Sequence, residues 1–335
     1  MPNETPGWQY AAQNHDLKIW LDQDTPLYFQ RIPAGSFRMG SRGEYGYEEP
    51  IHRVEMTRPF YMSTFPVTQA QWRAVVSQYP GSDLKPVPSH FEGDLRPVEQ
   101  VSWHDVNQWC HLVSGGDLIR FATDAAGNAI KLIQPRLDLP TEAQWEYACR
   151  AGTDTEYHTG DGEAAMAAAG WYDENSESQT HDVGWKARNA FGLYDVHGSV
   201  DEWCRDAWSE DLYKLRVDGV ADPVVSAAAV GKSEDDADRV IRGGSWDSSA
   251  WYCRAAFRDW WGPGYRNWYL GFRVCLFFGP AVPSEQTGTG VTSEPVSGDV
   301  ARRQAAAKSE DSGVDVTEVD LSNASLPERS DGTKF

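Results

Sequence analysis

Residues 242–273 read RGGSWDSSAWYCRAAFRDWWGPGYRNWYLGFR, and this stretch is the most informative in the 335-residue chain. It holds five of the fifteen tryptophans, together with five arginines and one cysteine, Cys253. No helix or strand period fits its aromatic residues, so they cannot all face one core and some are expected at the surface. Exposed aromatic residues interleaved with arginine are typical of a surface that binds another molecule.

The composition argues against several classes of protein. A formal net charge of −20 disfavours nucleic acid as the main partner, because phosphate binding requires a basic surface. The chain has no run of eighteen apolar residues, and its N-terminus lacks a basic start followed by an apolar stretch. We therefore expect neither a membrane-spanning helix nor a signal peptide. Five cysteines without CxxC spacing predict reduced thiols, and hence a cytoplasmic protein, rather than disulfides or a zinc site.

Three parts are predicted along the chain. Residues 1–27 are a polar lead-in, and residues 28–278 form one domain without a long low-complexity break. Residues 279–335 are rich in Ser, Gly, Thr, Asp and Glu, with no aromatic residue before the last position. Such a segment buries too little apolar surface to offset its ordering entropy, so we expect a disordered acidic tail.

Three helices are predicted from one recurring start signal. Thr68, Ser102 and Thr141 each precede, by three residues, a side chain that can return the hydrogen bond of a capping box. The remaining apolar runs are short and broken by Gly, Pro, Asn and Asp, which is typical of short strands and ordered loops. The pattern predicts an α+β fold with little regular structure.

A series of motifs across the domain resembles the formylglycine-generating enzyme, or sulfatase-modifying factor, family. The resemblance runs from about residue 29 to residue 274 in the order of the family. It implies a modified C-type-lectin-like fold that is loop-rich and is usually stabilised by calcium. The motifs are IPAGSFRMGS (32–41), FPVTQAQW (65–72), RPVEQVSWHDVNQWC (96–110), LPTEAQWEYACRAGT (139–153), NAFGLYDVHGSVDEWCRD (189–206), RVIRGGSW (239–246) and LGFRVC (270–275).

The resemblance implies a copper site that this chain does not complete. Family members that oxidise a substrate cysteine to formylglycine hold Cu(I) between two cysteines, five residues apart, after the GGS motif. The second cysteine falls on Cys253, but the first falls on Ser248, whose hydroxyl is a hard ligand that stays protonated near neutral pH. Ser245 lines the pocket in catalytic relatives, but no sequence pattern supplies it with a histidine base. We therefore expect no copper, and Cys253 becomes a packed or lone reactive thiol.

The resemblance also implies a calcium loop. The matching positions are Asp195, the carbonyls of Gly198 and Val200, and Glu202. These are hard oxygens in a tight turn, as calcium requires. The alternative is an acidic loop that binds no ion. A second site, around Asn175 or Asp182, is left open.

A second branch of the same fold, the variable proteins of diversity-generating retroelements, is similar to residues 242–273. That resemblance divides the stretch into frame residues, which stay fixed, and contact positions, which vary to recognise different ligands. The frame residues are Arg242, Gly243, Gly244, Ser245, Trp246, Cys253, Arg254, Ala256, Arg258, Pro263, Arg266, Gly271, Phe272 and Arg273. The contact positions are Asp247, Ser248, Ser249, Trp251, Tyr252, Phe257, Asp259, Trp260, Trp261, Tyr265, Asn267, Trp268 and Tyr269.

Two functions follow from these patterns. The first is a ligand-binding protein that recognises a protein or peptide through the contact positions, whose rigid aromatic side chains give contact area at low entropy cost. The alternative is a divergent oxidase that converts a substrate cysteine in a sulfatase-type peptide to formylglycine. A simpler explanation of the aromatics is that about half of them pack the loop-rich core.

Overall fold

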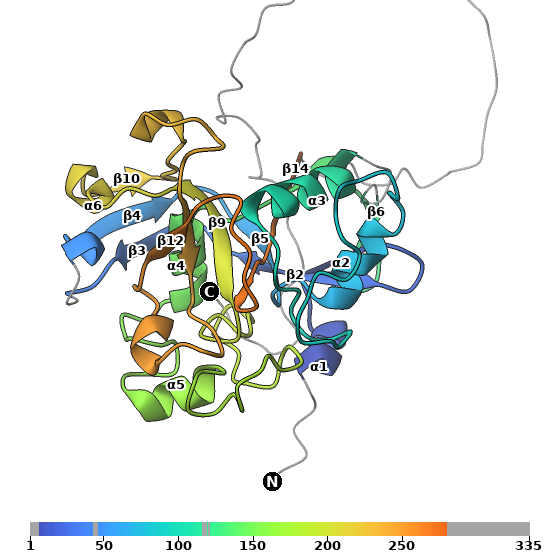
Figure 1. Cartoon of the computed structure of the whole chain (residues 1–335), viewed down its shortest axis with the longest axis horizontal. Helices are drawn as coiled ribbons and strands as arrows, with labels where there is room; N and C mark the ends of the chain where they lie inside the picture. The colour runs from blue at the N-terminus through green and yellow to red at the C-terminus, as the bar shows by residue number, and fades with distance from the viewer. Residues whose placement is uncertain (1–6, 43–45, 116–118, 120, 280–335) are drawn as a thin grey trace, which may run out of the picture.

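The computed structural model describes residues 7–42, 46–115, 119 and 121–279. Short helices and three sheets are joined by long ordered loops, which confirms the α+β, loop-rich prediction (Figure 1). The predicted disorder of the acidic tail falls on residues 280–335, which lie outside the described part of the chain. Among the described residues, no helix is both long and apolar enough to cross a membrane.

The largest sheet has seven strands in the order β7-β6-β1-β2-β5-β14-β8, and its neighbours pair antiparallel. Its last strand in sequence, β14, lies between β5 and β8 and so joins the end of the domain to its beginning and middle. The strands are β1 (Leu17–Trp20), β2 (Pro26–Ile32), β5 (Phe60–Ser63), β6 (Phe121–Asp124), β7 (Ala129–Lys131), β8 (Ile133–Asp138) and β14 (Cys275–Gly279).

The lead-in predicted for residues 1–27 is not separate from the domain. It contains β1, which pairs with both β2 and β6 and buries Leu17 and Ile19 in the main core. The alternation of apolar and polar residues in LKIW was too short to signal a strand. The domain therefore begins before residue 28.

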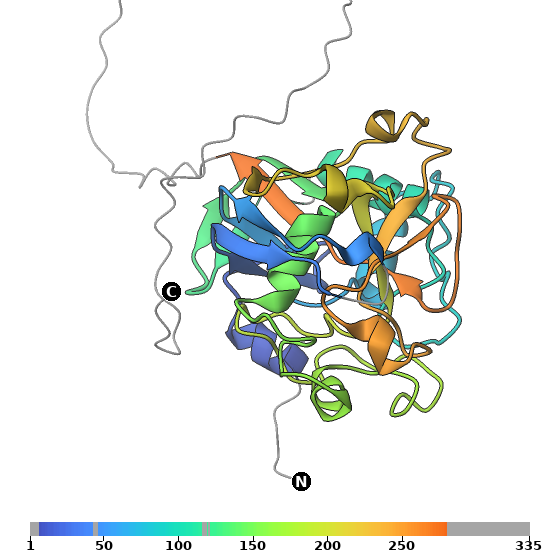
Figure 2. The same cartoon turned by 90° about the vertical axis from the view of Figure 1, so that its left-hand side faces the viewer.

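Two smaller sheets flank helix α4 (Figure 2). In the three-stranded sheet, β4 pairs antiparallel with β3 and parallel with β10. The four-stranded sheet has the order β12-β11-β9-β13 and carries both ends of the 242–273 stretch. The strands are β3 (Gly35–Met39), β4 (His52–Met56), β9 (Asp201–Ala207), β10 (Val220–Ala221), β11 (Arg239–Arg242), β12 (Asp259–Trp261) and β13 (Leu270–Gly271).

The three predicted helices form where their start signals lie. Thr68 and Thr141 each make a complete capping box, and Ser102 and Asp105 exchange the equivalent hydrogen bonds at 2.8 and 3.2 Å. The α-helices are α1 (Gly7–Gln13), α2 (Gln69–Val76), α3 (Trp103–Gly115), α4 (Glu142–Arg150), α5 (Glu163–Ala169) and α6 (Leu212–Leu215). The 3-10 turns are η1 (Gly46–Glu48), η2 (Ala228–Val230) and η3 (Ala250–Cys253).

Helices α2 and α3 pack on one another in the main core, where Trp72 and Trp109 lie nearly parallel with ring centroids 6.2 Å apart. Phe272 meets both rings edge-on. The C-terminal end of the 242–273 stretch is therefore fixed in the main core, and the rest of the stretch crosses the front of the molecule in Figure 1.

Candidate functional site

Helix α4 provides two buried carboxylates that hold the 242–273 stretch in place. Arg258 donates to Glu142 from Nε at 2.5 Å and from Nη2 at 3.0 Å. Arg242 donates to Glu146, and its Nε lies 3.7 Å from Glu142. All four side chains are fully buried. Burial alone would raise the pKa of Glu142, but the charges of Arg258 and Arg242 outweigh it and lower the pKa to about 2.

The other three arginines of the stretch also bind carboxylates that are distant in sequence. Arg254 makes a two-pronged contact with Glu48, at 3.1 and 2.9 Å, and both side chains are buried. The buried Arg273 donates to Glu202 at 2.7 Å. Arg266, half-exposed, donates to Asp105 at 2.6 and 2.8 Å.

The five arginines of the stretch are all frame residues. Four of them lie beneath the surface as buried ion pairs. Of the fourteen frame residues, thirteen are buried, and only Arg266 is exposed. The frame is thus a rigid base, since each buried guanidinium is fixed by two or more hydrogen bonds.

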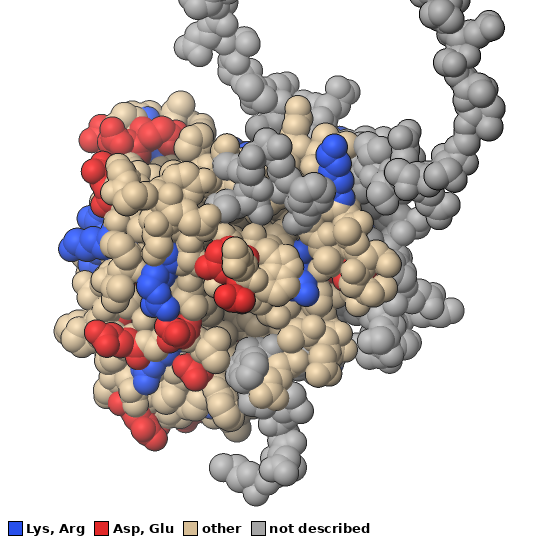
Figure 3. Space-filling model, turned by 90° about the vertical axis from the view of Figure 1, so that its right-hand side faces the viewer, with Lys and Arg blue, Asp and Glu red and all other residues tan. Residues whose placement is uncertain are grey.

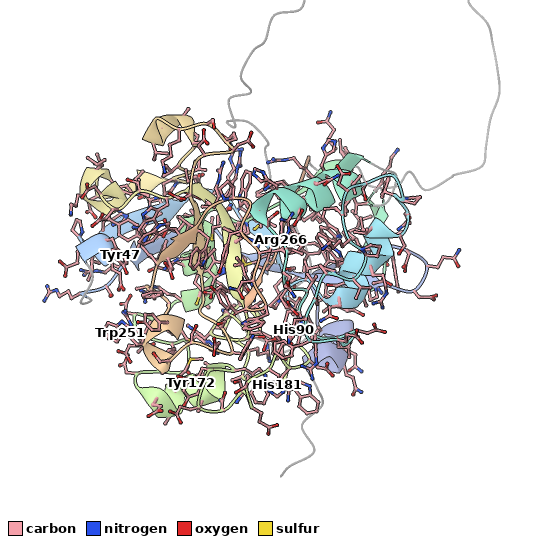
Figure 4. All side chains as sticks on the ribbon, viewed as in Figure 1. Tyr47, His90, Tyr172, His181, Trp251 and Arg266 are labelled. Carbon is pink, nitrogen blue, oxygen red and sulfur yellow. The ribbon has the colours of Figure 1, made fainter. Side chains whose placement is uncertain are left out.

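Twelve of the thirteen contact positions reach the surface. The exposed ones are Asp247, Tyr252, Trp260 and Trp268. The half-buried ones are Ser248, Ser249, Trp251, Asp259, Trp261, Tyr265, Asn267 and Tyr269. We call these twelve residues the contact surface. In Figure 4, Trp251 lies toward the left of the molecule, whereas His90 and Arg266 lie nearer its middle, with Arg266 above His90.

Phe257 is the one contact position that the structure places elsewhere. Only 5% of this residue is exposed, and its ring packs edge-on against Tyr252. It follows directly after Ala255 and Ala256, which are also buried, and comes just before the buried Arg258. The expectation that Phe257 contacts a ligand is therefore wrong, and the residue supports the surface from below.

Other segments add aromatic residues that the sequence did not indicate. Trp208 stacks on Trp260 with ring centroids 4.2 Å apart, and Tyr47 meets both rings edge-on. At the other side, the exposed His90 lies against Trp268, with ring centroids 5.3 Å apart. These residues come from distant parts of the chain, and no local pattern marks them.

The positions that correspond to the copper pair are Ser248 and Cys253. Ser248 Oγ lies 3.0 Å from both the backbone nitrogen and the hydroxyl of Ser245. Cys253 is fully buried in a small cluster with Tyr157 and Met166. Burial, and then the charge of Asp201, raises the pKa of the Cys253 thiol well above its ordinary value, so the thiol stays protonated.

The loop from Asp195 to Glu202 has the shape and the free oxygens of a cation site. Asp195, Gly198 and Ser199 have positive φ angles of 53°, 70° and 68°, which makes the turn tight. Gly198 is required there, because a Cβ would lie 2.0 Å from the carbonyl oxygen of Trp171. Oδ1 of Asp195 and Oε1 of Glu202 are both buried without a hydrogen-bond partner.

Two unpaired carboxylate oxygens of this kind fit a hard cation such as calcium. Burial raises the pKa of Asp195 to about 6, and the nearby charge of Glu202 adds to that effect. A divalent cation would offset both the burial of the Asp195 carboxylate and its repulsion from Glu202. Among the described residues, no group of three or more His, Cys, Asp and Glu side chains gathers as a metal site, so the carbonyls of Gly198 and Val200 would supply the remaining ligands. In the loop proposed for a second site, the side chain of Asn175 caps a turn by accepting from the nitrogen of Tyr172.

The same loop supports the contact surface through backbone hydrogen bonds. The backbone nitrogen of Gly198 donates to the carbonyl of Gly243 at 2.8 Å. The backbone nitrogen of Trp246 donates to the carbonyl of Ser199 at 3.0 Å. The backbone nitrogen of Asp201 donates to the carbonyl of Tyr269 at 2.8 Å. Hydrogen bonds therefore connect this loop to both ends of the stretch that carries the contact surface.

Comparisons with known proteins agree with this architecture. The sequence model of the sulfatase-modifying factor enzyme 1-like domain matches residues 24–276. The chain is 29% identical to the formylglycine-generating enzyme of Mycobacterium tuberculosis, over 72% of this chain and 95% of that protein. It is 30% identical to the formylglycine-generating enzyme of Thermomonospora curvata, over 72% and 91%.

Two solved structures are also similar. Treponema denticola variable protein 1 superposes with a TM-score of 0.60 and 30% identity, covering 77% of this chain and 98% of that one. PvdO from Pseudomonas aeruginosa has a TM-score of 0.59 and 25% identity, covering 82% and 99%. The first supports the variable-protein branch that residues 242–273 resemble.

Proposed function

Because this chain belongs to the sulfatase-modifying factor family, we propose that it uses the family's fold to bind a protein or peptide through the contact surface. The observation that carries the proposal is the division within residues 242–273. Thirteen of fourteen frame residues are buried, whereas twelve of thirteen contact positions are exposed or half-buried. A surface built this way can change its side chains without disturbing the core beneath it.

The chemistry of the contact surface supports recognition. It is rich in Trp and Tyr, whose rigid rings bury large areas at low entropy cost, and in Ser, Asp and Asn, which supply adaptable hydrogen bonds. On the side of the molecule drawn in Figure 3, the described Lys and Arg side chains lie in small separate groups among acidic ones. This distribution supports a partner other than nucleic acid. The five free, buried cysteines support the accompanying proposal of a cytoplasmic location.

The alternative, a divergent formylglycine-generating oxidase, is favoured by two observations. Cys253 and Ser245 are retained at the family's positions, and two of the similar proteins are formylglycine-generating enzymes. Against it stand the serine at position 248 and the burial of Cys253, since soft thiolates are what hold Cu(I).

Calcium is proposed as a structural ion, held by Asp195, Glu202 and the carbonyls of Gly198 and Val200. When bound, it would neutralise two buried carboxylates and stiffen the loop on which both ends of the contact surface rest. Its role in this proposal is support, because no contact position contributes a ligand.

The experiment that tests the proposed function compares the wild-type chain with a Trp260→Ala/Trp268→Ala variant as immobilised bait for the proteins of its own cell. A matched control is Trp185→Ala, which removes a tryptophan that is 55% exposed and lies outside the contact surface. We expect at least one purified partner to bind the wild type and the control but to lose roughly tenfold or more in affinity for the double variant. Equal affinity for all three would overturn the proposal.

A second measurement decides the alternative. Cu(I) is titrated into the wild type and into Cys253→Ala, and both are incubated with a CxPxR-type peptide. We expect no stoichiometric copper binding and no aldehyde product. Copper binding that disappears in Cys253→Ala, or an aldehyde on the peptide, would favour the oxidase.

A further inference from the structure

Two neighbouring residues of β12, Trp260 and Trp261, each stack on another aromatic ring. Trp260, 37% exposed, stacks on Trp208, and Trp261 stacks on Tyr265 with ring centroids 4.2 Å apart. Tyr269 joins the second pair through a hydroxyl–hydroxyl contact of 3.2 Å with Tyr265. The faces of such rings carry partial negative charge and attract cations.

Two arginines of the stretch already lie over aromatic rings, Arg258 at 4.5 Å from the centroid of Trp208 and Arg254 at 3.7 Å from that of Trp251, and both arginines are buried. Among the described residues, none of the five arginines lies over Trp260, Trp261, Tyr265 or Tyr269. None of the contact positions is a lysine or an arginine, and all five arginines of residues 242–273 are paired with carboxylates. Four of those arginines are buried beneath the surface. The stretch looks basic in sequence but offers a ligand almost no positive charge.

Negative charge, in contrast, is left without a counter-ion. In the part of the chain that the structure describes, no arginine or lysine forms an ion pair with Asp201, Asp247 or Asp259. Asp259 is half-buried on strand β12 and Asp247 is exposed, so both carboxylates can meet a ligand.

Asp259 lies beside these rings along the chain. It directly precedes Trp260 and Trp261, and its Oδ1 accepts from the backbone nitrogen of Trp260 at 2.9 Å. A cationic group at this point would meet aromatic faces and a carboxylate that has no ion-pair partner among the described residues.

We propose that the contact surface takes a cationic partner, a peptide or protein segment that presents arginine or lysine side chains to Asp259 and the surrounding tryptophan and tyrosine rings. This inference rests on the proposed function, since it names the chemistry of the ligand that the same surface binds. The formal charge of −20 on the whole chain would speed the encounter with such a partner.

The test is a fluorescence-anisotropy titration of the full chain at about 150 mM salt, an ionic strength at which long-range attraction is screened beyond about 8 Å. The first probe is a labelled dodecapeptide with four arginines separated by glycine and serine, and the second carries glutamate in place of each arginine. The variants are Asp259→Asn and Trp260→Ala. The matched controls are Asp83→Asn and Trp185→Ala, which remove the same groups from exposed positions outside the contact surface.

We expect the arginine peptide to bind the wild type and both controls, and to bind each contact variant at least about threefold more weakly. The glutamate peptide should not bind. Circular dichroism melts of the variants separate loss of binding from loss of fold. The inference is overturned if the arginine peptide fails to bind, or if the contact variants bind it as well as the controls do. If instead the glutamate peptide binds and Trp260→Ala weakens it, the cationic partner is wrong while the proposed function stands.

Discussion

Arg258 and Glu142 form a two-pronged ion pair in which neither side chain is exposed to solvent. One partner belongs to the stretch that carries the contact surface, and the other lies in the first turn of α4. The pair therefore joins the recognition surface to the core. Its geometry explains how twelve surface residues can be presented by a segment with almost no regular structure of its own.

Removing one partner of this pair should unfold much of the domain. Arg258→Ala leaves the carboxylate of Glu142 buried with only Arg242 near it, so we expect a loss of about 3–5 kcal/mol in the free energy of unfolding. The matched control is Arg266→Ala, which breaks the half-exposed contact with Asp105 and should cost at most about 1 kcal/mol. Urea denaturation measures both, and similar losses for the two variants would contradict the assignment.

Acid should destabilise the domain through Glu142. The pKa of this carboxyl is about 2 in the folded protein, against an ordinary value of 4.5. A lowered folded-state pKa contributes stability that is present above pH 4.5 and is lost as the pH falls toward 2. We expect the stability difference between wild type and Glu142→Gln to narrow over that window. A difference that stays constant from pH 5 to pH 2.5 would show that Glu142 is not ion-paired.

Chelation should lower the melting temperature at neutral pH. At calcium concentrations about a hundred times the dissociation constant, binding stabilises by about 2.7 kcal/mol, which for a domain of this size corresponds to about 5 °C or more. Without the ion, the pKa of Asp195 is about 6, so the folded state carries a destabilising charge above that pH and loses it as the pH falls. The effect of EDTA should therefore be larger at pH 7.5 than at pH 5.

Asp195→Asn is the matching variant, and it should lose most of the response to calcium. A melting temperature that is the same with EDTA and with excess calcium would remove Asp195, Gly198, Val200 and Glu202 as a cation site.

Truncation of Phe257 should cost far more stability than truncation of the exposed contact positions Trp268 and Tyr252. Phe257 is buried, so Phe257→Ala is expected to cost about 3–5 kcal/mol of unfolding free energy. Trp268→Ala and Tyr252→Ala remove side chains that are 45% and 40% exposed, and should change stability by less than about 1 kcal/mol. Thermal melts distinguish the two classes. A large loss on truncation of Trp268 would show that this ring belongs to the core.

Much of this architecture could be predicted from local patterns. The capping boxes at Thr68 and Thr141 need only residues three apart, and both form as predicted. The motif series identified the family, and with it a division of residues 242–273 into frame and contact positions. In the structure the frame residues are buried except Arg266, and the contact positions reach the surface except Phe257.

The sequence could not reveal contacts between distant residues. The partners of Arg254 and Arg258 lie 206 and 116 positions away, at Glu48 and Glu142, so the stretch alone does not show which carboxylates hold its arginines. For the same reason Trp208 was not recognised as a neighbour of Trp260. Burial of an arginine depends on a carboxylate that no periodic pattern locates.

The central claim is that the contact surface is a replaceable recognition surface on a fixed base. Its most direct test is the thermal unfolding of a set of variants in which all twelve exposed or half-buried contact positions are randomised while the frame residues and Phe257 are kept. We predict that most variants still unfold cooperatively, with melting temperatures within about 20 °C of the wild type, because surface substitutions rarely change stability by more than about 0.5 kcal/mol each and twelve of them together cost at most about 6 kcal/mol. If most of them are unfolded at room temperature, the contact positions hold the core together and the claim is wrong.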